Sequence, residues 1–257
     1  MSILFSGDFH AGISGEMYAI NKKTLLRKYQ REKYNNIKYH IILGDGSFMW
    51  PGLQKYDDKT YMELARRPFP VLCVLGNHEP IYGMIEKMPE IDIGIGEKVY
   101  QIQARPFVAY LKRGKVYTID GFKLLVLGGA QSLDKEAHLP HKTWWKEENW
   151  LEKEKKELLD LIEKENTFDC VLSHTGPERI NRLILRYSII PHASFNDEVG
   201  LLNDVINEWF CGHLHRDIYY YDANAKKGYQ YLYRTTKILD KVDNQILVYN
   251  EFGKTER

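Results

Sequence analysis

The chain has 257 residues, of which 44% are hydrophobic and 28% are charged, a balance typical of globular proteins and not of disordered ones. Its 36 lysines and arginines nearly cancel 35 aspartates and glutamates, and the net charge of +1 excludes a general basic bias toward nucleic acid. No run approaches the roughly 20 apolar residues of a membrane-spanning helix, and the N-terminus lacks a signal-peptide pattern, so we expect no membrane partner and a cytoplasmic location. Cys73, Cys170 and Cys211 lie in separate apolar runs, where we expect reduced, buried thiols.

Short apolar runs, each ending in glycine or a polar cluster, recur along the chain and predict buried strands. They lie at Ser2–Ser6, Tyr39–Leu43, Val71–Leu75, Lys123–Leu127, Cys170–Ser173 and Trp209–Cys211. Stretches with helical character separate the first three runs, over residues 15–36 and 57–67. Strand and helix therefore alternate at the start of the chain, which predicts βαβ units and a largely parallel sheet.

Later parts of the chain alternate short extended segments with turns, a pattern that favours antiparallel hairpins. Residues 98–127 contain turn sequences at Lys112–Lys115 and Asp120–Gly121. Residues 217–250 contain another turn, at 222–228, between two tyrosine-rich segments. The fold is thus expected to combine parallel units with antiparallel hairpins.

Residues 146–166 predict the clearest helix, with an apolar stripe opposite a charged face. Such a stripe could bind a partner, but packing against a sheet is the more ordinary explanation, and we favour it. We predict an α/β fold of two packed mixed β-sheets flanked by helices. The sequence shows no repeat and no linker, so one domain is expected over residues 1–257.

Five polar motifs follow the predicted strands. They are Gly7-Asp8-Phe9-His10, Gly44-Asp45-Gly46, Gly76-Asn77-His78-Glu79, Ser173-His174 and Gly212-His213-Leu214-His215. In open α/β sheets, ligands bind where loops leave the carboxyl ends of strands. Each motif alone is common in turns or in hydrogen-bonded cores, but five uncompensated polar groups beside five hydrophobic strands would be costly. A shared metal centre is the economical explanation.

The expected ligands offer oxygen and imidazole nitrogen, without cysteine. Imidazole suits zinc, iron, manganese or nickel, and carboxylate and amide oxygens suit harder ions. Seven ligands are too many for one tetrahedral zinc, but they fit two ions if one carboxylate bridges them. Two such ions can hold a hydroxide between them and clamp the attacking and leaving oxygens of an in-line displacement. We therefore predict two divalent ions as cofactors, with manganese favoured.

The order of the motifs resembles the pattern D-x-H, GD, GNH[DE], H and GHxH of the calcineurin-like metallophosphoesterase superfamily. Residues 128–135, followed by Trp144-Trp145, are also similar to small bacterial and prophage-borne members. The resemblance implies a phosphate-ester hydrolase, with His78 contacting the substrate phosphate or protonating the leaving oxygen. It also implies the metal ligands: Asp8, His10 and His215 for one ion, Asn77, His174 and His213 for the other, and Asp45 as the bridge.

The sequence departs from the family pattern after Asp45. Many members carry GDxxD, whose last aspartate steers the histidine of GNH, but this chain has Phe48 there. His78 would then be oriented by another acid, such as Asp134 or Glu16, or by none.

The resemblance favours phosphodiesters, such as cyclic nucleotides or nucleic-acid fragments, over phosphomonoesters. A protein phosphatase is disfavoured because residues 46–50 do not match GDxxDRG, and a lariat-debranching relative is disfavoured because His10 is present. A non-catalytic interaction module with the same fold is a further alternative, but such proteins lose several ligands. A nuclease subunit is another, although the chain has no long coiled-coil region.

Two further sets of residues have alternative interpretations. Arg179, Arg182 and Arg186 would share one helical face, either as a phosphate clamp or as an ordinary solvated surface, which we favour. Trp144 and Trp145 could stack on a base, but packing is the more ordinary role. The sequence therefore leaves the substrate-binding residues unknown.

Overall fold

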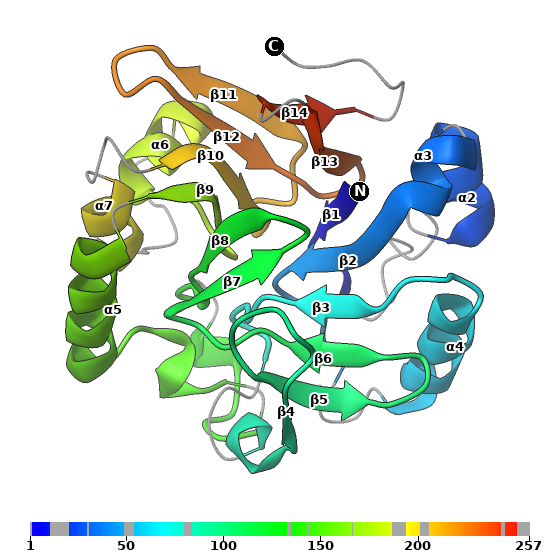
Figure 1. Cartoon of the computed structure of the whole chain (residues 1–257). Coiled ribbons are helices and arrows are strands. Elements are labelled where there is room, and N and C mark those ends of the chain that lie inside the picture. The colour runs from blue at the N-terminus through cyan, green and yellow to red at the C-terminus, as the bar shows by residue number, and fades with distance from the viewer. Residues whose placement is uncertain are drawn as a thin grey trace.

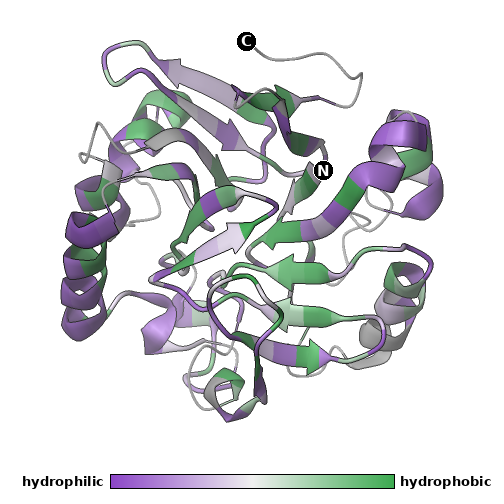
Figure 2. Ribbon diagram, in the orientation of Figure 1, coloured by the Kyte–Doolittle hydropathy of each residue, from purple (hydrophilic) through white to green (hydrophobic). Residues whose placement is uncertain are grey.

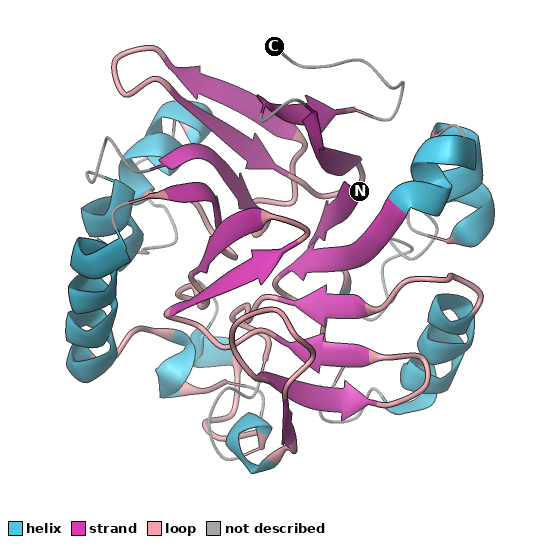
Figure 3. Ribbon diagram, viewed as in Figure 1, coloured by secondary structure: helices cyan, strands magenta, loops and turns pink. Residues whose placement is uncertain are grey.

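Two β-sheets form the centre of the molecule, and helices cover their outer faces (Figure 1, Figure 3). The computed structural model describes residues 2–10, 21–29, 31–48, 54–79, 84–132, 135–142, 144–165, 167–186, 194–200, 206–242 and 245–250. In spatial order, the eight-stranded sheet contains β14 (Gln245–Tyr249), β13 (Thr236–Val242), β1 (Ser2–Gly7), β2 (Ile37–Leu43), β3 (Val71–Cys73), β6 (Val108–Tyr110), β5 (Val99–Gln103) and β4 (Glu90–Ile91). The six-stranded sheet contains β11 (Ile218–Asp222), β12 (Lys227–Tyr231), β10 (Ile206–Cys211), β9 (Phe168–Leu172), β8 (Phe122–Val126) and β7 (Lys115–Ile119).

Both sheets are mixed, as predicted, with parallel strands at their centres. In the first sheet, β1, β2, β3 and β6 pair in parallel, and in the second, β8, β9, β10 and β12 do so. The outer pairs, such as β11 with β12 and β7 with β8, are antiparallel hairpins. Central parallel strands are covered on both faces, which explains why their sequences are almost continuously apolar. The predicted fold class is confirmed.

The main hydrophobic core lies between the two sheets. Phe5 of β1 stacks on Phe210 of β10, with ring centroids 4.5 Å apart, so the two sheets are in direct contact there. In Figure 2 the central strands are mostly hydrophobic, whereas the helices carry both hydrophobic and hydrophilic residues. The three cysteines are free and buried, as predicted.

The helices pack on the outer faces in separate clusters. They are α2 (Lys22–Lys28), α3 (Arg31–Asn36), α4 (Gln54–Ala65), α5 (Glu152–Glu165), α6 (Glu178–Leu185) and α7 (Ser194–Gly200), with 3-10 turns η2 (Ile85–Lys87), η3 (Lys135–Ala137) and η4 (Lys146–Glu148). Leu158 and Ile162 of α5 join a cluster with Val171 and Trp209 of the six-stranded sheet, so its apolar stripe packs on a sheet as favoured. Among the described residues, none of the helices combines the length and the apolar composition needed to span a membrane.

The predicted helix over 146–166 is wrong at its start. Residues 146–148 form η4, and α5 begins at Glu152. The side chain of Glu148 is buried and accepts hydrogen bonds from Ser132, sixteen positions earlier, a tertiary contact that helical periodicity does not predict.

Candidate metal centre

The five motifs meet where strands of both sheets end. Asp8 follows β1, Asp45 follows β2, Asn77 follows β3, His174 follows β9 and His213 follows β10. The backbone N–H of His10 donates to the carbonyl of Asp45 at 2.6 Å, which joins the first two loops. A Cβ atom added to Gly44 would collide with the ring of His174, so this glycine permits the close approach of the two sheets.

Several loop residues at this edge have unusual backbone conformations. Positive φ angles occur at Asp8 (33°), His10 (45°), Asp45 (49°), His213 (66°) and His215 (49°). Five of the seven expected ligands thus have backbone φ angles that residues other than glycine rarely adopt. Such conformations cluster at functional sites, because the surrounding fold must hold them in place.

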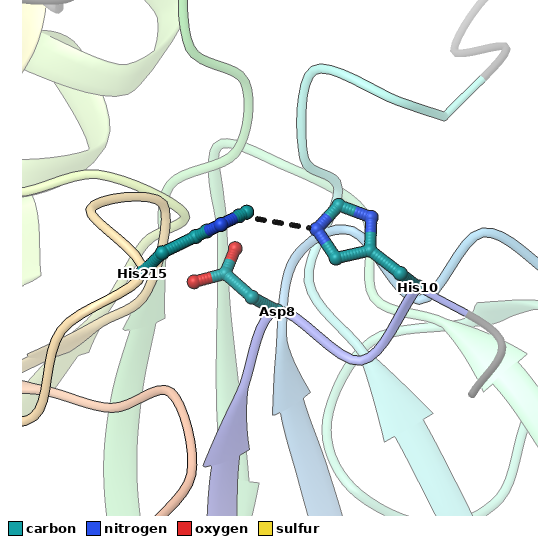
Figure 4. A group of neighbouring side chains, drawn as sticks. All are labelled: Asp8, His10 and His215. Carbon is teal, nitrogen blue, oxygen red and sulfur yellow. Dashed lines mark hydrogen bonds between the residues drawn. The ribbon is translucent and has the colours of Figure 1, made fainter. Parts of the chain in front are cut away.

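The first ligand group comprises Asp8, His10 and His215 (Figure 4). Their ligand atoms lie within 4.8 Å of one another, and the Nε2 atoms of His10 and His215 are 3.2 Å apart. Asp8 is fully buried, and among the described residues neither of its carboxylate oxygens accepts a hydrogen bond of ordinary geometry. Buried carboxylate oxygens normally have a partner, so this arrangement fits a cation.

The second ligand group comprises Asp45, Asn77, His174 and His213. Nδ1 of His174 lies 2.9 Å from the carbonyl oxygen of Leu43, so Nδ1–H donates there and Nε2 faces the centre. Around Nε2 lie Asn77 Oδ1 at 2.9 Å and Asp45 Oδ2 at 3.3 Å. His213 Nδ1 lies 3.1 Å from the same atom. Four potential ligand atoms therefore lie close together, and a cation among them could bind to all four.

Asp45 lies between the two ligand groups. Its Oδ2 atom is 3.3 Å from Nε2 of His174 and 3.9 Å from Nε2 of His10. Its Oδ1 atom accepts the backbone N–H of His78 at 3.0 Å, which fixes the carboxylate plane. The position suits a carboxylate that two ions share.

Burial and mutual attraction set the pKa values of these groups. Burial raises the pKa of Asp8 to about 8, even though His174 opposes the shift. Burial acts in the opposite sense on His174, but Asp45 and Asp8 outweigh it and raise the pKa of His174 to about 10. Burial, with His174 beside it, lowers the pKa of His213 to about 3. In protein without metal, a proton on His174 thus supplies the positive charge that holds the pKa of Asp45 well below its usual range, and a divalent cation could replace it.

His78 lies beside the two groups and belongs to neither. Its Nε2 atom is 3.9 Å from Asp45 Oδ2, and its ring packs edge-on against His10, at 5.6 Å, and His138, at 6.1 Å. The side chain is 27% exposed, so it can reach a bound substrate. The suggested orienting acids, Asp134 and Glu16, lie outside the described residues.

Phe48 occupies the position of the aspartate that many relatives use to steer this histidine. It is buried and packs between Phe9 and Tyr61, with ring centroids 5.8 and 5.9 Å away. This position therefore contributes to an aromatic cluster of the core and offers no carboxylate to His78.

Sequence reasoning missed the role of Glu79, the last residue of its motif. This buried carboxylate accepts the backbone N–H groups of Gly76, Ser47 and Asp45 at 2.5, 3.0 and 3.2 Å. It therefore ties the loop after β3 to the loop after β2, and burial, with Asp45 nearby, raises its pKa to about 7. The sequence signal for this role was the acidic residue at the fourth position of the pattern GNH[DE].

Tyr233 was also missed, because nothing in the sequence links it to the motifs. Its ring stacks on His215 at 4.8 Å between centroids, with 3° between the planes. The stack holds the most exposed of the expected ligands in one orientation.

The arginines of α6 engage acidic neighbours. Arg179 donates to Asp222 at 2.8 Å, and Arg182 donates from Nε to Glu178 at 2.7 Å. The favoured interpretation as an ordinary surface agrees with these pairs. Trp145 is buried, which agrees with a packing role.

Comparisons with known proteins agree with this geometry. Residues 1–217 match the family described as calcineurin-like phosphoesterase. A solved crystal structure shares 12% identity at a TM-score of 0.57, with 97% of this chain and 98% of that chain covered. The structure of a phosphopantetheinyl hydrolase from Mycobacterium tuberculosis shares 12% identity at a TM-score of 0.52, covering 91% of this chain and 90% of that one. These low identities show the fold alone, and a comparison with curated proteins gave no match.

Proposed function

We propose that this chain, which belongs to the calcineurin-like phosphoesterase family, hydrolyses phosphodiesters at a centre of two divalent metal ions. Family membership makes it a metal-dependent hydrolase of phosphate esters. The number of ions, the preference for diesters and the roles of individual residues are our proposal. The observation that carries it is the position of Asp45 between two clusters of ligand atoms.

The ligand atoms suggest how the ions would be divided. Asp8, His10 and His215 would hold one ion, and Asn77, His174 and His213 would hold the other. Asp45 would contact both, because its Oδ2 atom faces a histidine of each group. The mixture of carboxylate, amide and imidazole ligands suits manganese, iron, zinc or nickel, and we favour manganese.

The protein groups around the centre have separate tasks. When bound, divalent ions lower the pKa of water and neutralise phosphate oxygens. The carbonyl of Leu43 holds the Nδ1–H of His174, which keeps Nε2 directed at the centre. Glu79 joins the loops that carry Asp45 and Asn77. His78 would donate a proton to the leaving oxygen from the exposed side of the site.

The preference for diesters rests on the family resemblance and on the residues after Asp45. The sequence there lacks the protein-phosphatase pattern, and Phe48 fills the position with core packing. A nucleotide or a nucleic-acid fragment is the substrate class that we propose, and a monoester is the second candidate.

The test compares two activated esters with added manganese. We expect kcat/KM for bis-p-nitrophenyl phosphate to exceed that for p-nitrophenyl phosphate by about tenfold, a difference of roughly 1.4 kcal/mol in barrier height. A faster reaction with the monoester would identify a phosphomonoesterase. Absence of hydrolysis of both esters by manganese-loaded protein would favour a non-catalytic module.

A further inference from the structure

A chain of buried hydrogen bonds leads away from the side-chain amide of Asn77. The Nδ2 atom of Asn77 donates to Ser132 Oγ at 3.0 Å. The hydroxyl of Ser132 donates to Glu148 Oε2 at 2.6 Å, and its backbone N–H donates to Glu148 Oε1 at 2.9 Å. The three residues are 5%, 5% and 1% exposed, so water does not substitute for these contacts.

The chemistry of the three groups fixes the direction of every hydrogen bond. Glu148 accepts the backbone N–H of Ser132 at Oε1 and takes the hydroxyl hydrogen of the same residue at Oε2. The lone pairs of Ser132 Oγ then face Asn77. They can accept a hydrogen bond from Nδ2 of Asn77, which carries hydrogens, but not from Oδ1, which carries none. A flipped amide would set its oxygen against Ser132 Oγ and turn its N–H groups toward His174. The relay therefore selects the amide orientation whose oxygen faces His174 Nε2 at 2.9 Å.

The segment that carries Glu148 is itself held in place. Arg113 donates to the carbonyl oxygens of Glu147, at 2.8 Å, and Asn149, at 3.3 Å, the residues on either side of Glu148. The same guanidinium pairs with the carboxylate of Glu154 at the start of α5. The backbone that carries Glu148 is thus fixed from both sides.

We propose that Glu148 and Ser132 are positioning residues, which hold the amide oxygen of Asn77 toward the ion that His174 and His213 bind. This inference rests on the proposed metal centre. An amide oxygen is a neutral ligand, so its contribution depends on orientation more than on charge. Outer partners of metal ligands typically contribute about 10- to 100-fold in metal affinity.

The test measures manganese binding to the full-length chain by calorimetry, after the removal of metal. Wild-type protein should bind two ions. Ser132→Ala should lower the affinity for one ion by about 10- to 100-fold and leave the other unchanged. Ser132→Thr, which keeps the hydroxyl, should restore the affinity. In cobalt-substituted protein, only the Ala variant should change the visible absorption of one site.

A double-mutant cycle separates positioning from general loss of structure. If Ser132 acts through Asn77, Ser132→Ala should have little further effect on manganese affinity in an Asn77→Ala background. The matched control is Ser6→Ala, which removes another buried hydroxyl, bonded to His40 at 2.7 Å. The control should lower thermal stability but leave both manganese affinities unchanged.

The outcomes distinguish this inference from the proposed function. Two ions in wild-type protein with an unchanged affinity in Ser132→Ala would overturn the positioning role and leave the metal centre standing. Additive effects of Ser132→Ala and Asn77→Ala would overturn it as well. Fewer than two ions in wild-type protein would overturn the two-ion centre and this inference together.

Discussion

The two ligand groups of the metal centre differ in how the protein holds them. In the second group, His174 is fixed by the carbonyl of Leu43 and Asn77 by the hydroxyl of Ser132. In the first group, His10 is half-buried and His215 is exposed, and stacking on Tyr233 holds the latter. Hydrogen bonds of the fold thus arrange the second group, whereas the first combines the buried Asp8 with two histidines that solvent can reach.

This difference follows from the position of each group in the fold. His174 leaves the six-stranded sheet and Leu43 ends a strand of the eight-stranded sheet, so a hydrogen bond between the two sheets fixes a ligand of the second group. His10 and His215 lie two positions further along their loops than Asp8 and His213, at the outer side of the centre. We therefore expect the ion of the second group to be bound more firmly and the ion of the first group to exchange more readily.

The largest expected effect comes from the residue that the two groups share. Asp45→Asn should reduce the content of both ions and lower kcat by about ten-thousandfold, the size of effect seen when hydrolases lose an essential charged group. Asp8→Asn should remove only the ion of the first group. Elemental analysis of both variants after manganese loading checks the difference. Two ions retained by Asp45→Asn would contradict the bridging role.

The order of strands and motifs could be predicted because it depends on local sequence. Apolar runs followed by glycine and a polar residue located the loops that carry Asp8, Asp45 and Asn77, and parallel pairing then brings such loops to one edge of a sheet. The structure brings all seven expected ligands together there, although their individual roles stay predictions. The single domain over residues 1–257 also stays a prediction.

The supporting contacts could not be predicted, because they join residues far apart in the sequence. Ser132 reaches Asn77 across 55 positions, and Tyr233 stacks on His215 through a hairpin connection. The predicted start of α5 is wrong for the same reason, since Glu148 hydrogen-bonds to Ser132 and the α-helix begins only at Glu152. Hydrophobic periodicity predicts which face of a helix or strand is buried, but not which distant polar residue contacts that face.

A smaller effect should come from His78, which lies at the exposed side of the first group. His78→Ala should keep both ions, because His78 belongs to neither ligand group. A general acid contributes about 100- to 10,000-fold only where the leaving oxygen needs a proton. We therefore expect a loss of about 100-fold on a ribose-linked diester and a much smaller loss on nitrophenyl esters.

Three results would revise that role. Equal losses on both ester types would make His78 a phosphate-binding residue, and loss of metal would make it a ligand. His138→Ala is the matched control, because its ring lies 6.1 Å from that of His78 between centroids and His138 belongs to neither ligand group. A larger loss of activity on the ribose-linked diester in His138→Ala than in His78→Ala would assign the role of proton donor to His138.

The smallest expected effect is a dependence of stability on pH, which reports on the two buried residues Asp8 and His174, one from each ligand group. In protein without metal, the pKa of His174 is raised from its ordinary 6.5 to about 10, and that of Asp8 from 3.8 to about 8. Each group binds its proton more tightly in the folded state than in the unfolded state. Their stabilising contribution is therefore complete below the unfolded pKa and is lost as pH rises through the folded one.

The contribution of Asp8 should consequently fall between pH 3.8 and about pH 8, and that of His174 between pH 6.5 and about pH 10. Where the two ranges overlap, the free energy of unfolding of metal-free protein should fall most steeply, by up to roughly 1.4 kcal/mol per pH unit for each titrating group. Bound manganese should remove this decline, because ligands release their protons when a metal binds. The stabilisation by manganese should thus grow with pH, as measured by urea denaturation with and without a chelator. Ser6→Ala serves as the control, since it should lower both curves equally. A metal-free stability that rises over the same pH range would show that His174 is neutral in the folded chain, and the charge balance within the second ligand group would then need another source.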